Sequence, residues 1–286
     1  MTTAIALFAV TQATADVDAQ VEFFKGINFI IDDGYEALEG ITARPFPSKR
    51  ISLLTVLKDI PEEYYEARGV LTSNLIKTVA MRLPADPYMH VILNSWKDLK
   101  TTPGYPAPFN QIGSRGISML VGNVESELSR LEKDFPGLHV RQRALTIKRK
   151  WGSTTSALVL DPEGTILELI SIKEGSPYDP KNAKPPTITD MSWLHFMYNC
   201  LHYKETRQFY ESFGMKHDHG VDFRPKVGFA PWGFDYFAKQ MMDAFNFDMT
   251  KAHGVAFLRQ DTDCSTMHLE LLEGTEGRLL ECHSHK

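Results

Sequence analysis

The spacing of apolar residues predicts a strand followed by a helix in residues 193–213. The run Trp193-Leu-His-Phe-Met-Tyr198 is apolar, contains aromatic residues and is too short for a helix. From Tyr203 to Phe213 apolar residues recur three and four positions apart, which is the period of an amphipathic helix. Gly214 is a typical residue just beyond a helix end, so we expect the helix to stop there.

Two later segments predict strands that complete this unit. Residues 255–258 form a short apolar run, and residues 267–272 alternate in part between apolar and polar side chains. Because successive residues of a strand point to opposite faces, His268 and Glu270 share one face. His195 and Glu270 are therefore predicted on the first and last strands of one module.

The same layout occurs twice more in the chain. One copy begins at Ala9, continues through Phe23 and ends with residues 90–96. Another begins at residues 116–121, passes through a polar helix and ends with residues 157–169. One unit of a strand, a helix and three strands is thus used three times, which indicates a repeat architecture.

Two long segments depart from this minimal unit. Residues 30–50 mix Asp, Gly and Pro before a predicted strand at 51–57, and residues 59–76 have a helical pattern in their first half. Residues 221–251 are rich in Phe, Tyr, Trp and Met. Such side chains line an apolar or aromatic substrate pocket, or form a lid or a dimer contact, and the sequence favours neither.

Composition and charge exclude some classes of partner. The chain has 286 residues, of which 43% are hydrophobic and 23% charged, as is ordinary for a globular protein of one large or two modest domains. A net charge of -5 argues against a nucleic-acid surface, which needs clustered Lys and Arg. No stretch approaches the roughly 18 uninterrupted apolar residues of a membrane span. We therefore predict neither a nucleic-acid nor a membrane partner.

The cysteines favour a reducing compartment. The chain has three cysteines, Cys200, Cys264 and Cys282. They form no C-x-x-C pair and their number is odd, so they do not indicate a disulfide framework. We accordingly predict a cytoplasmic protein. Residues 4–15 loosely resemble a secretory signal but lack a basic region before the apolar run, so we interpret them as the first strand.

In the order and spacing of these segments the chain resembles the vicinal oxygen chelate superfamily, which includes glyoxalase I, fosfomycin-resistance proteins and extradiol ring-cleavage dioxygenases. The resemblance rests on the helix with Phe209-Tyr210, on the run Leu158-Val-Leu-Asp-Pro-Glu-Gly-Thr-Ile-Leu-Glu168-Leu, and on the linker at 105–113. It implies an α+β fold in which repeated βαβββ modules form cupped mixed sheets. It also implies a divalent metal held by residues of the first and last strands.

The resemblance allows the metal positions of the modules to be compared. Phe209 lies fourteen residues after His195, and the same step back from Phe23 reaches Ala9, which has no donor atom. The place of the acid in that first module falls near Ile92. The first module is therefore expected to be without ligands.

The second module has no His near Ser118, yet it keeps Glu168 on its closing strand. The expected metal ligands are His195, Glu270 and Glu168. The competing interpretation is that His195 is a hydrogen-bonded core residue and that Glu168 faces solvent at a sheet edge.

A His with carboxylate oxygens suits Fe(II), Mn(II), Zn(II) or Ni(II). The third module alone offers only His195 and Glu270. It could pair with its twin in a second subunit, pack against the second module and borrow Glu168, or bind no metal.

We favour the first arrangement, a homodimer, because a Pro-rich linker separates the third module from the others. This gives a paired, ligand-poor N-terminal cup at residues 1–175, a linker at 176–190, and a third module with its aromatic-rich insertion at 191–286.

For function, the resemblance implies a metal-dependent enzyme that acts on a small oxygenated, aromatic metabolite in the manner of an extradiol dioxygenase. A glyoxalase-like lyase or isomerase is the alternative, because His195 and Glu270 lie on one module. A metal-free small-molecule binding protein or cyclase that uses the same cup also remains open. His202, Tyr198 and His219 are candidate acid or base residues by titration range and nearness in sequence.

Overall fold

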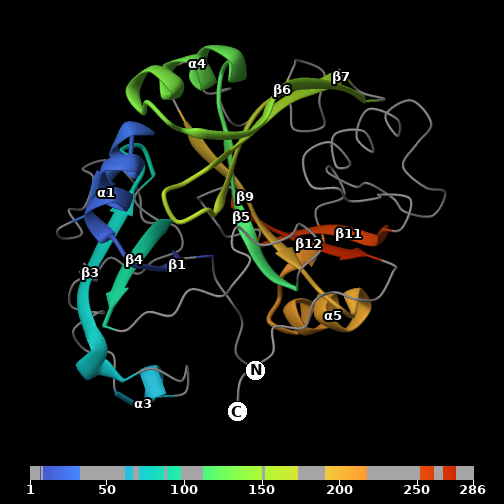
Figure 1. Ribbon diagram of the computed structural model, residues 1–286. Coiled ribbons are helices and arrows are strands. Elements are labelled where there is room, and N and C mark those ends of the chain that lie inside the picture. Colours follow the sequence, from blue (N-terminus) through green and yellow to red (C-terminus); the bar gives the residue numbers. More distant parts are fainter. Residues whose placement is uncertain are drawn as a thin grey trace. The chain divides into compact units, whose positions relative to one another are not determined.

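A computed structural model describes ten stretches of the chain (Figure 1). They are residue 7 and residues 9–32, 62–66, 71–86, 89–97, 112–149, 152–172, 191–217, 252–260 and 267–274. The predicted linker at 176–190, the predicted strand at 51–57 and the aromatic-rich insertion at 221–251 lie outside these residues.

The elements follow one order three times, as the sequence predicted. The first module consists of β1 (Ala9–Thr14), α1 (Val17–Gly26), β2 (Ile30–Ile31), β3 (Leu75–Arg82) and β4 (His90–Trp96), with the short helices α3 (Glu62–Glu66) and η1 (Thr72–Asn74) between β2 and β3. The second consists of β5 (Gly113–Leu120), α4 (Val124–Asp134), β6 (His139–Arg149), β7 (Gly152–Leu160) and β8 (Ile166–Ile172). The third consists of β9 (Ser192–Asn199), α5 (Tyr203–Ser212), β10 (Lys216–His217), β11 (Ala252–Arg259) and β12 (His268–Gly274). The predicted α+β fold with repeated βαβββ modules is confirmed.

Each module also has the same strand order. The first strand pairs in parallel with the last strand, and the remaining pairs are antiparallel. The first module forms a four-stranded sheet in the order β1-β4-β3-β2. The second and third modules form one eight-stranded sheet in the order β10-β11-β12-β9-β5-β8-β7-β6. Antiparallel pairing of β5 with β9 joins these two modules.

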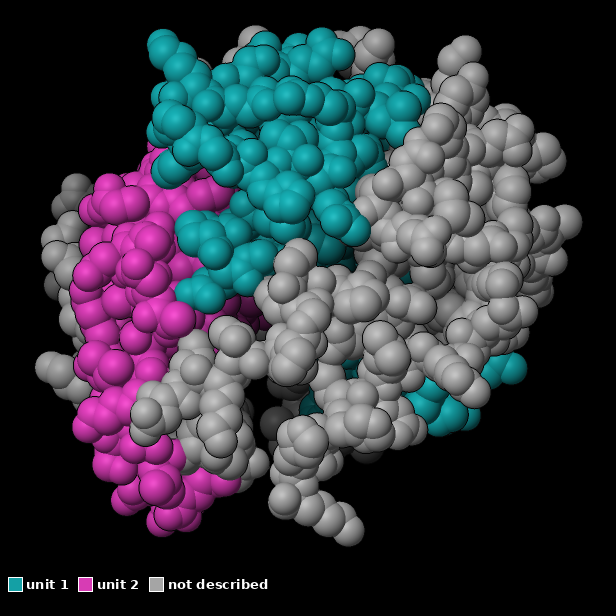
Figure 2. Space-filling model, in the orientation of Figure 1, with its two compact units in different colours: residues 1–5, 104–261, 266–286 teal, residues 6–103, 262–265 magenta. Residues whose placement is uncertain are grey.

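This division of the chain differs from the predicted one. The chain forms two compact units, one comprising residues 6–103 and 262–265 and the other comprising 1–5, 104–261 and 266–286 (Figure 2). The third module thus shares a sheet with the second module, whereas the sequence favoured a paired cup at 1–175. The physical reason is that a sheet edge carries unpaired backbone groups, which any other edge of suitable twist can pair with.

Local sequence explains where the helices begin and end. The side chain of Asp16 accepts a hydrogen bond from the backbone N–H of Ala19 and so caps α1. Asn123 caps α4 in the same way through the N–H of Ser126. Gly214 follows α5 with a positive φ, which agrees with its predicted place beyond the helix end. No helix in the described ranges is long and apolar enough to cross a membrane.

Gly116 on β5 allows β5 and β8 to approach each other closely. It pairs with Ile166 on β8, and a Cβ atom at this position would collide with the carbonyl oxygen of Ile166. Backbone atoms of a central strand cannot move aside as a flexible side chain can. Gly116 therefore fixes the spacing of the two strands two residues before Ser118 pairs with Glu168.

The substitution Gly116→Ala is expected to destabilise the protein by about 1–3 kcal/mol or more, because the added methyl group overpacks a strand pair. Urea denaturation measures this change. Ser114→Ala is the matched control, since Ser114 is exposed on the same strand and such changes stay within about 0.5 kcal/mol. Equal stability of Gly116→Ala and wild type would contradict the proposed close contact.

Candidate functional site

Four strands at the centre of the eight-stranded sheet bring polar residues into one row. Glu168 on β8 is paired with Ser118 on β5, and Ser118 is paired in turn with His195 on β9. On the other side of β9, His195 is paired with His268 on β12, and Glu270 lies two residues further along β12. Paired residues share a face of the sheet. The β5–β9 pairing thus places side chains of the second and third modules next to one another.

The His195 ring lies between the two carboxylates. Its Nε2 atom is 3.2 Å from Oε2 of Glu270 and 3.4 Å from Oε2 of Glu168. The side chains of Glu168 and Glu270 are 14% and 19% exposed, while His195 is buried. The ring of Phe257 packs edge-on against His195, with centroids 5.4 Å apart. We refer to His195, Glu168 and Glu270 as the His195 cluster.

The two carboxylates differ in their electrostatic surroundings. Burial tends to raise the pKa of Glu168, but the hydrogen bond and charge of His195 and the hydroxyls of Ser118 and Ser156 outweigh it, so this pKa is lowered. The pKa of Glu270 is raised, because burial and the charge of Glu168 outweigh the attraction of His195. Burial alone would lower the pKa of His195, but the two carboxylates raise it. Glu168 therefore favours its charged form, whereas Glu270 takes up a proton more readily than an ordinary glutamate.

The donor set of the His195 cluster fits a divalent cation in chemical type. Two donors bound to one Zn²⁺ at about 2.0–2.2 Å lie roughly 3.0–3.5 Å apart, and both nitrogen–oxygen separations in the cluster are in this range. As they stand, no three or more His, Cys, Asp or Glu side chains in the described ranges are arranged as a finished metal site. In the structure the His195 cluster is a set of ion pairs, because Nε2 of His195 faces the two carboxylates directly. The same three side chains supply the nitrogen and oxygen donors that a divalent cation binds.

The structure brings the three predicted ligand residues together within one chain. The favoured arrangement took the second carboxylate from a second subunit, whereas in this chain the third module pairs with the second and Glu168 of β8 lies next to His195. The sequence had left this arrangement open as an alternative. The homodimer itself stays a prediction. Ser118 and Phe257 were not predicted at the site, because their roles depend on strand register.

Of the predicted acid and base residues, the two that the structure describes, Tyr198 and His202, do not join the His195 cluster. Tyr198 is an odd number of residues from His195 on β9, so its side chain points to the opposite face of the sheet. Burial, followed by the charge of Tyr198, raises the pKa of Tyr210 on α5. His202 is the exposed N-cap residue of α5. His219 lies outside the described residues. Nearness in sequence was a poor guide to these two residues. Successive side chains of β9 point to opposite faces of the sheet, and the chain leaves the sheet for α5 after Asn199.

The first module keeps the fold of the other modules but has apolar residues at the corresponding places. Ala9 packs against a buried cluster of Ala80 and Ile92. The register pairs Ile92 with Ala80, and β1 with β4 in parallel. Hydrophobic contacts therefore occupy the positions where the third module has His195 and Glu270.

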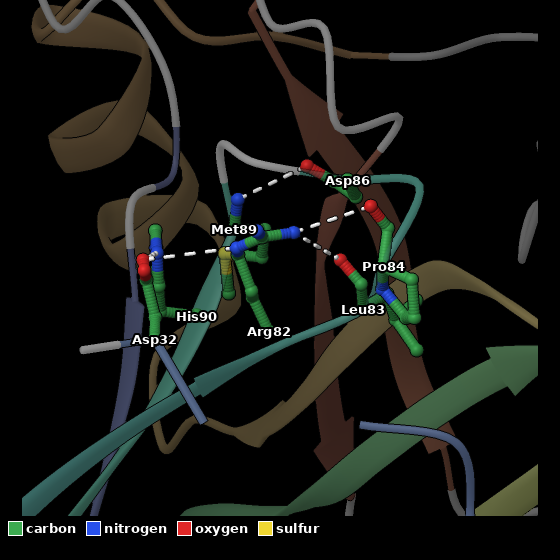
Figure 3. Close-up of polar contacts among 7 residues, drawn as sticks. All are labelled: Asp32, Arg82, Leu83, Pro84, Asp86, Met89 and His90. Carbon is green, nitrogen blue, oxygen red and sulfur yellow. Dashed lines mark hydrogen bonds and ion pairs between the residues drawn. The ribbon is translucent and has the colours of Figure 1, made fainter. Parts of the chain in front are cut away.

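A separate polar cluster lies in the first module (Figure 3). Nε2 of His90 is 2.9 Å from Oδ2 of Asp32, and Nε of Arg82 is 3.8 Å from the same oxygen. The side chains of His90 and Asp32 are almost completely buried. Arg82 also donates to the carbonyl oxygens of Leu83 and Pro84. The cluster ties the chain after β2 to β3 and β4, and the sequence pattern carried no signal for it.

Removing one partner of a buried ion pair leaves an uncompensated polar group and costs about 3–5 kcal/mol. The substitution Asp32→Ala is therefore expected to lower the free energy of unfolding by an amount of this order, measured by urea denaturation. Lys77→Ala is the control, because its ion pair with Asp18 is at the surface and such pairs contribute about 0–1 kcal/mol. Similar losses for the two variants would show that the Asp32 cluster does not stabilise the module.

Comparison with known proteins places the fold. No family model matches the sequence, and no curated protein matches it. Among solved structures, glyoxalase I from Zea mays superposes with a TM-score of 0.53 at 16% identity, over 95% of this chain and 68% of that chain. The chain therefore shares the fold of glyoxalase I. A glyoxalase family protein from Bacillus cereus covers 59% of this chain and 94% of its own, with 17% identity and a TM-score of 0.42.

Proposed function

We propose that this glyoxalase-like chain is a divalent-metal enzyme that acts on a small oxygenated metabolite, with His195, Glu168 and Glu270 as the metal ligands. The observation that supports it is the convergence of one imidazole and two carboxylates, from two modules, at the centre of one sheet. Fe(II), Mn(II), Zn(II) and Ni(II) all suit this donor set. A bound cation would hold two neighbouring substrate oxygens and stabilise negative charge that develops on them.

The residues of the His195 cluster suit proton transfer next to a carbonyl group. Glu168 stays charged and is held by hydroxyl groups. Glu270 has a raised pKa, and its carboxylate can take a proton from the substrate and return it. Phe257 packs on His195 and limits the access of water to the ring. We therefore propose lyase or isomerase chemistry of the glyoxalase type as the reaction class.

Extradiol dioxygenase chemistry is the second candidate. It is favoured by the small number of protein donors, since dioxygen and both substrate oxygens need open positions on the metal. Non-haem Fe(II) oxygenases commonly use two His and one carboxylate, whereas this cluster has one His and two carboxylates. For this reason the proton-transfer class comes first. A metal-free binding protein is the outcome that the next experiment would reveal.

Metal analysis tests the proposed ligands. Protein purified without chelator is expected to retain a divalent metal, measured by elemental analysis, and His195→Ala is expected to lose it while the fold survives in circular dichroism. His202→Ala is the matched control, since His202 is exposed at the start of α5. Unchanged metal content in His195→Ala would refute His195 as a ligand, and no metal in wild type would refute the metal enzyme and leave the binding protein.

The role of Glu270 is tested by solvent exchange. Metal-loaded wild type in D₂O is expected to exchange the hydrogen next to the carbonyl of small α-hydroxyketones, measured by NMR. Glu270→Gln should slow this exchange about 10²–10⁴-fold, because an amide cannot accept the proton. Glu205→Gln, on the exposed side of α5, should exchange like wild type. Oxygen uptake with catechols, without any exchange, would instead favour the dioxygenase.

A further inference from the structure

The carboxylates of Glu168 and Glu270 hold corresponding places but different hydrogen-bond partners. Each lies on the last strand of its module, β8 or β12. Oε2 of Glu168 accepts a hydrogen bond from Oγ of Ser118 at 2.6 Å, and the hydroxyl of Ser156 also bonds this carboxylate. Among the described residues, the carboxylate of Glu270 forms an ion pair with His195 and accepts no comparable bond from a hydroxyl group.

The two serines occupy positions where a strand would ordinarily have an apolar residue. Ser118 is 0% exposed and Ser156 is 2% exposed, and both lie in central strands of the sheet. Val and Ile fit such positions better than Ser. A buried hydroxyl also costs free energy unless it is hydrogen-bonded. The carboxylate of Glu168 supplies the partner that explains both serines.

Strand register aims both hydroxyls at Glu168. Ser118 is directly opposite Glu168 in the parallel pair β5–β8. Ser156 on β7 is paired with Ile170, while Leu158 is paired with Glu168, so Ser156 and Glu168 are diagonal neighbours on one face. Diagonal neighbours lie within reach of each other when one side chain is long, as that of Glu is.

The shared oxygen sets the orientation of the Glu168 carboxylate. Oε2 of Glu168 both receives the Ser118 hydroxyl and faces Nε2 of His195 at 3.4 Å. An ionised carboxylate oxygen has two lone pairs. With one lone pair bonded to Ser118, the other is directed at His195, and rotation of the carboxylate group is restricted.

We propose that Ser118 and Ser156 are positioning residues that hold the Glu168 carboxylate toward His195. Glu168 is then the fixed carboxylate of the His195 cluster, and Glu270 is the exchangeable one. Where it concerns a metal, this inference rests on the proposed function. Hydrogen-bond partners of metal-binding carboxylates typically change metal affinity about 10–100-fold when they are removed.

Titration with Co(II) tests the proposal, with affinity and the visible absorption spectrum as readouts. Ser118→Ala and Ser156→Ala should each weaken Co(II) binding about 10–100-fold and shift the spectrum, because the carboxylate turns away from the ion. Ser114→Ala, an exposed serine on β5, should bind like wild type. In a Glu168→Leu background, in which residue 168 accepts no hydrogen bond, Ser118→Ala should have no further effect. Wild-type affinity and spectrum in both serine variants, or equal weakening in the Glu168→Leu background, would overturn the proposal.

The positioning role is also testable without metal, which separates it from the proposed function. If wild type binds no Co(II), the metal enzyme is refuted, and thermal unfolding of the metal-free protein decides the role of Ser118. Ser118→Ala should then lower the unfolding midpoint by about 2–4 °C for each kcal/mol of lost hydrogen bonding. The double variant Ser118→Ala/Glu168→Leu should unfold no lower than Glu168→Leu alone, because Leu accepts no hydrogen bond from Ser118. Additive shifts would overturn the inference.

Discussion

The antiparallel pairing of β5 with β9 is the interaction on which the candidate site depends. It joins two modules that each have their own strand order, and it makes them one sheet. Ser118 and His195 face each other in this pairing, and Glu168 and Glu270 lie on the strands next outward. A shift of one residue in this register would turn the His195 side chain to the opposite face.

The polar row at the sheet centre is compatible with burial because its members pair with one another. An isolated charged group in such a place would be expensive. Here the imidazole of His195 lies between two carboxylates, and hydroxyl groups bond one of them. The imbalance between Glu168 and Glu270 follows from those hydroxyls. One βαβββ unit used twice therefore gives two glutamates with different chemistry.

The first module shows what the same topology forms without these residues. Its strands have the same order as those of the other modules, and Ala9, Ala80 and Ile92 pack together. Its buried polar group, Asp32 with His90 and Arg82, instead connects neighbouring strands. Fold and chemistry are thus separable in this protein, as expected when one unit carries different side chains.

The sequence by itself determined the modules and the types of residue at their ends. Alternation placed Glu270 with His268 on one face of β12, and the helical period with Gly214 defined α5, because both depend on neighbours in the chain. The same dependence on chain neighbours explains why Tyr198 was predicted near His195. Nearness in sequence takes no account of the face of the strand to which a side chain points. Only the tertiary structure decided which edges pair, that Glu168 reaches His195, and that Ser118 and Ser156 hold it. Edge pairing uses backbone groups that every residue carries, so side-chain patterns do not encode which edge is chosen.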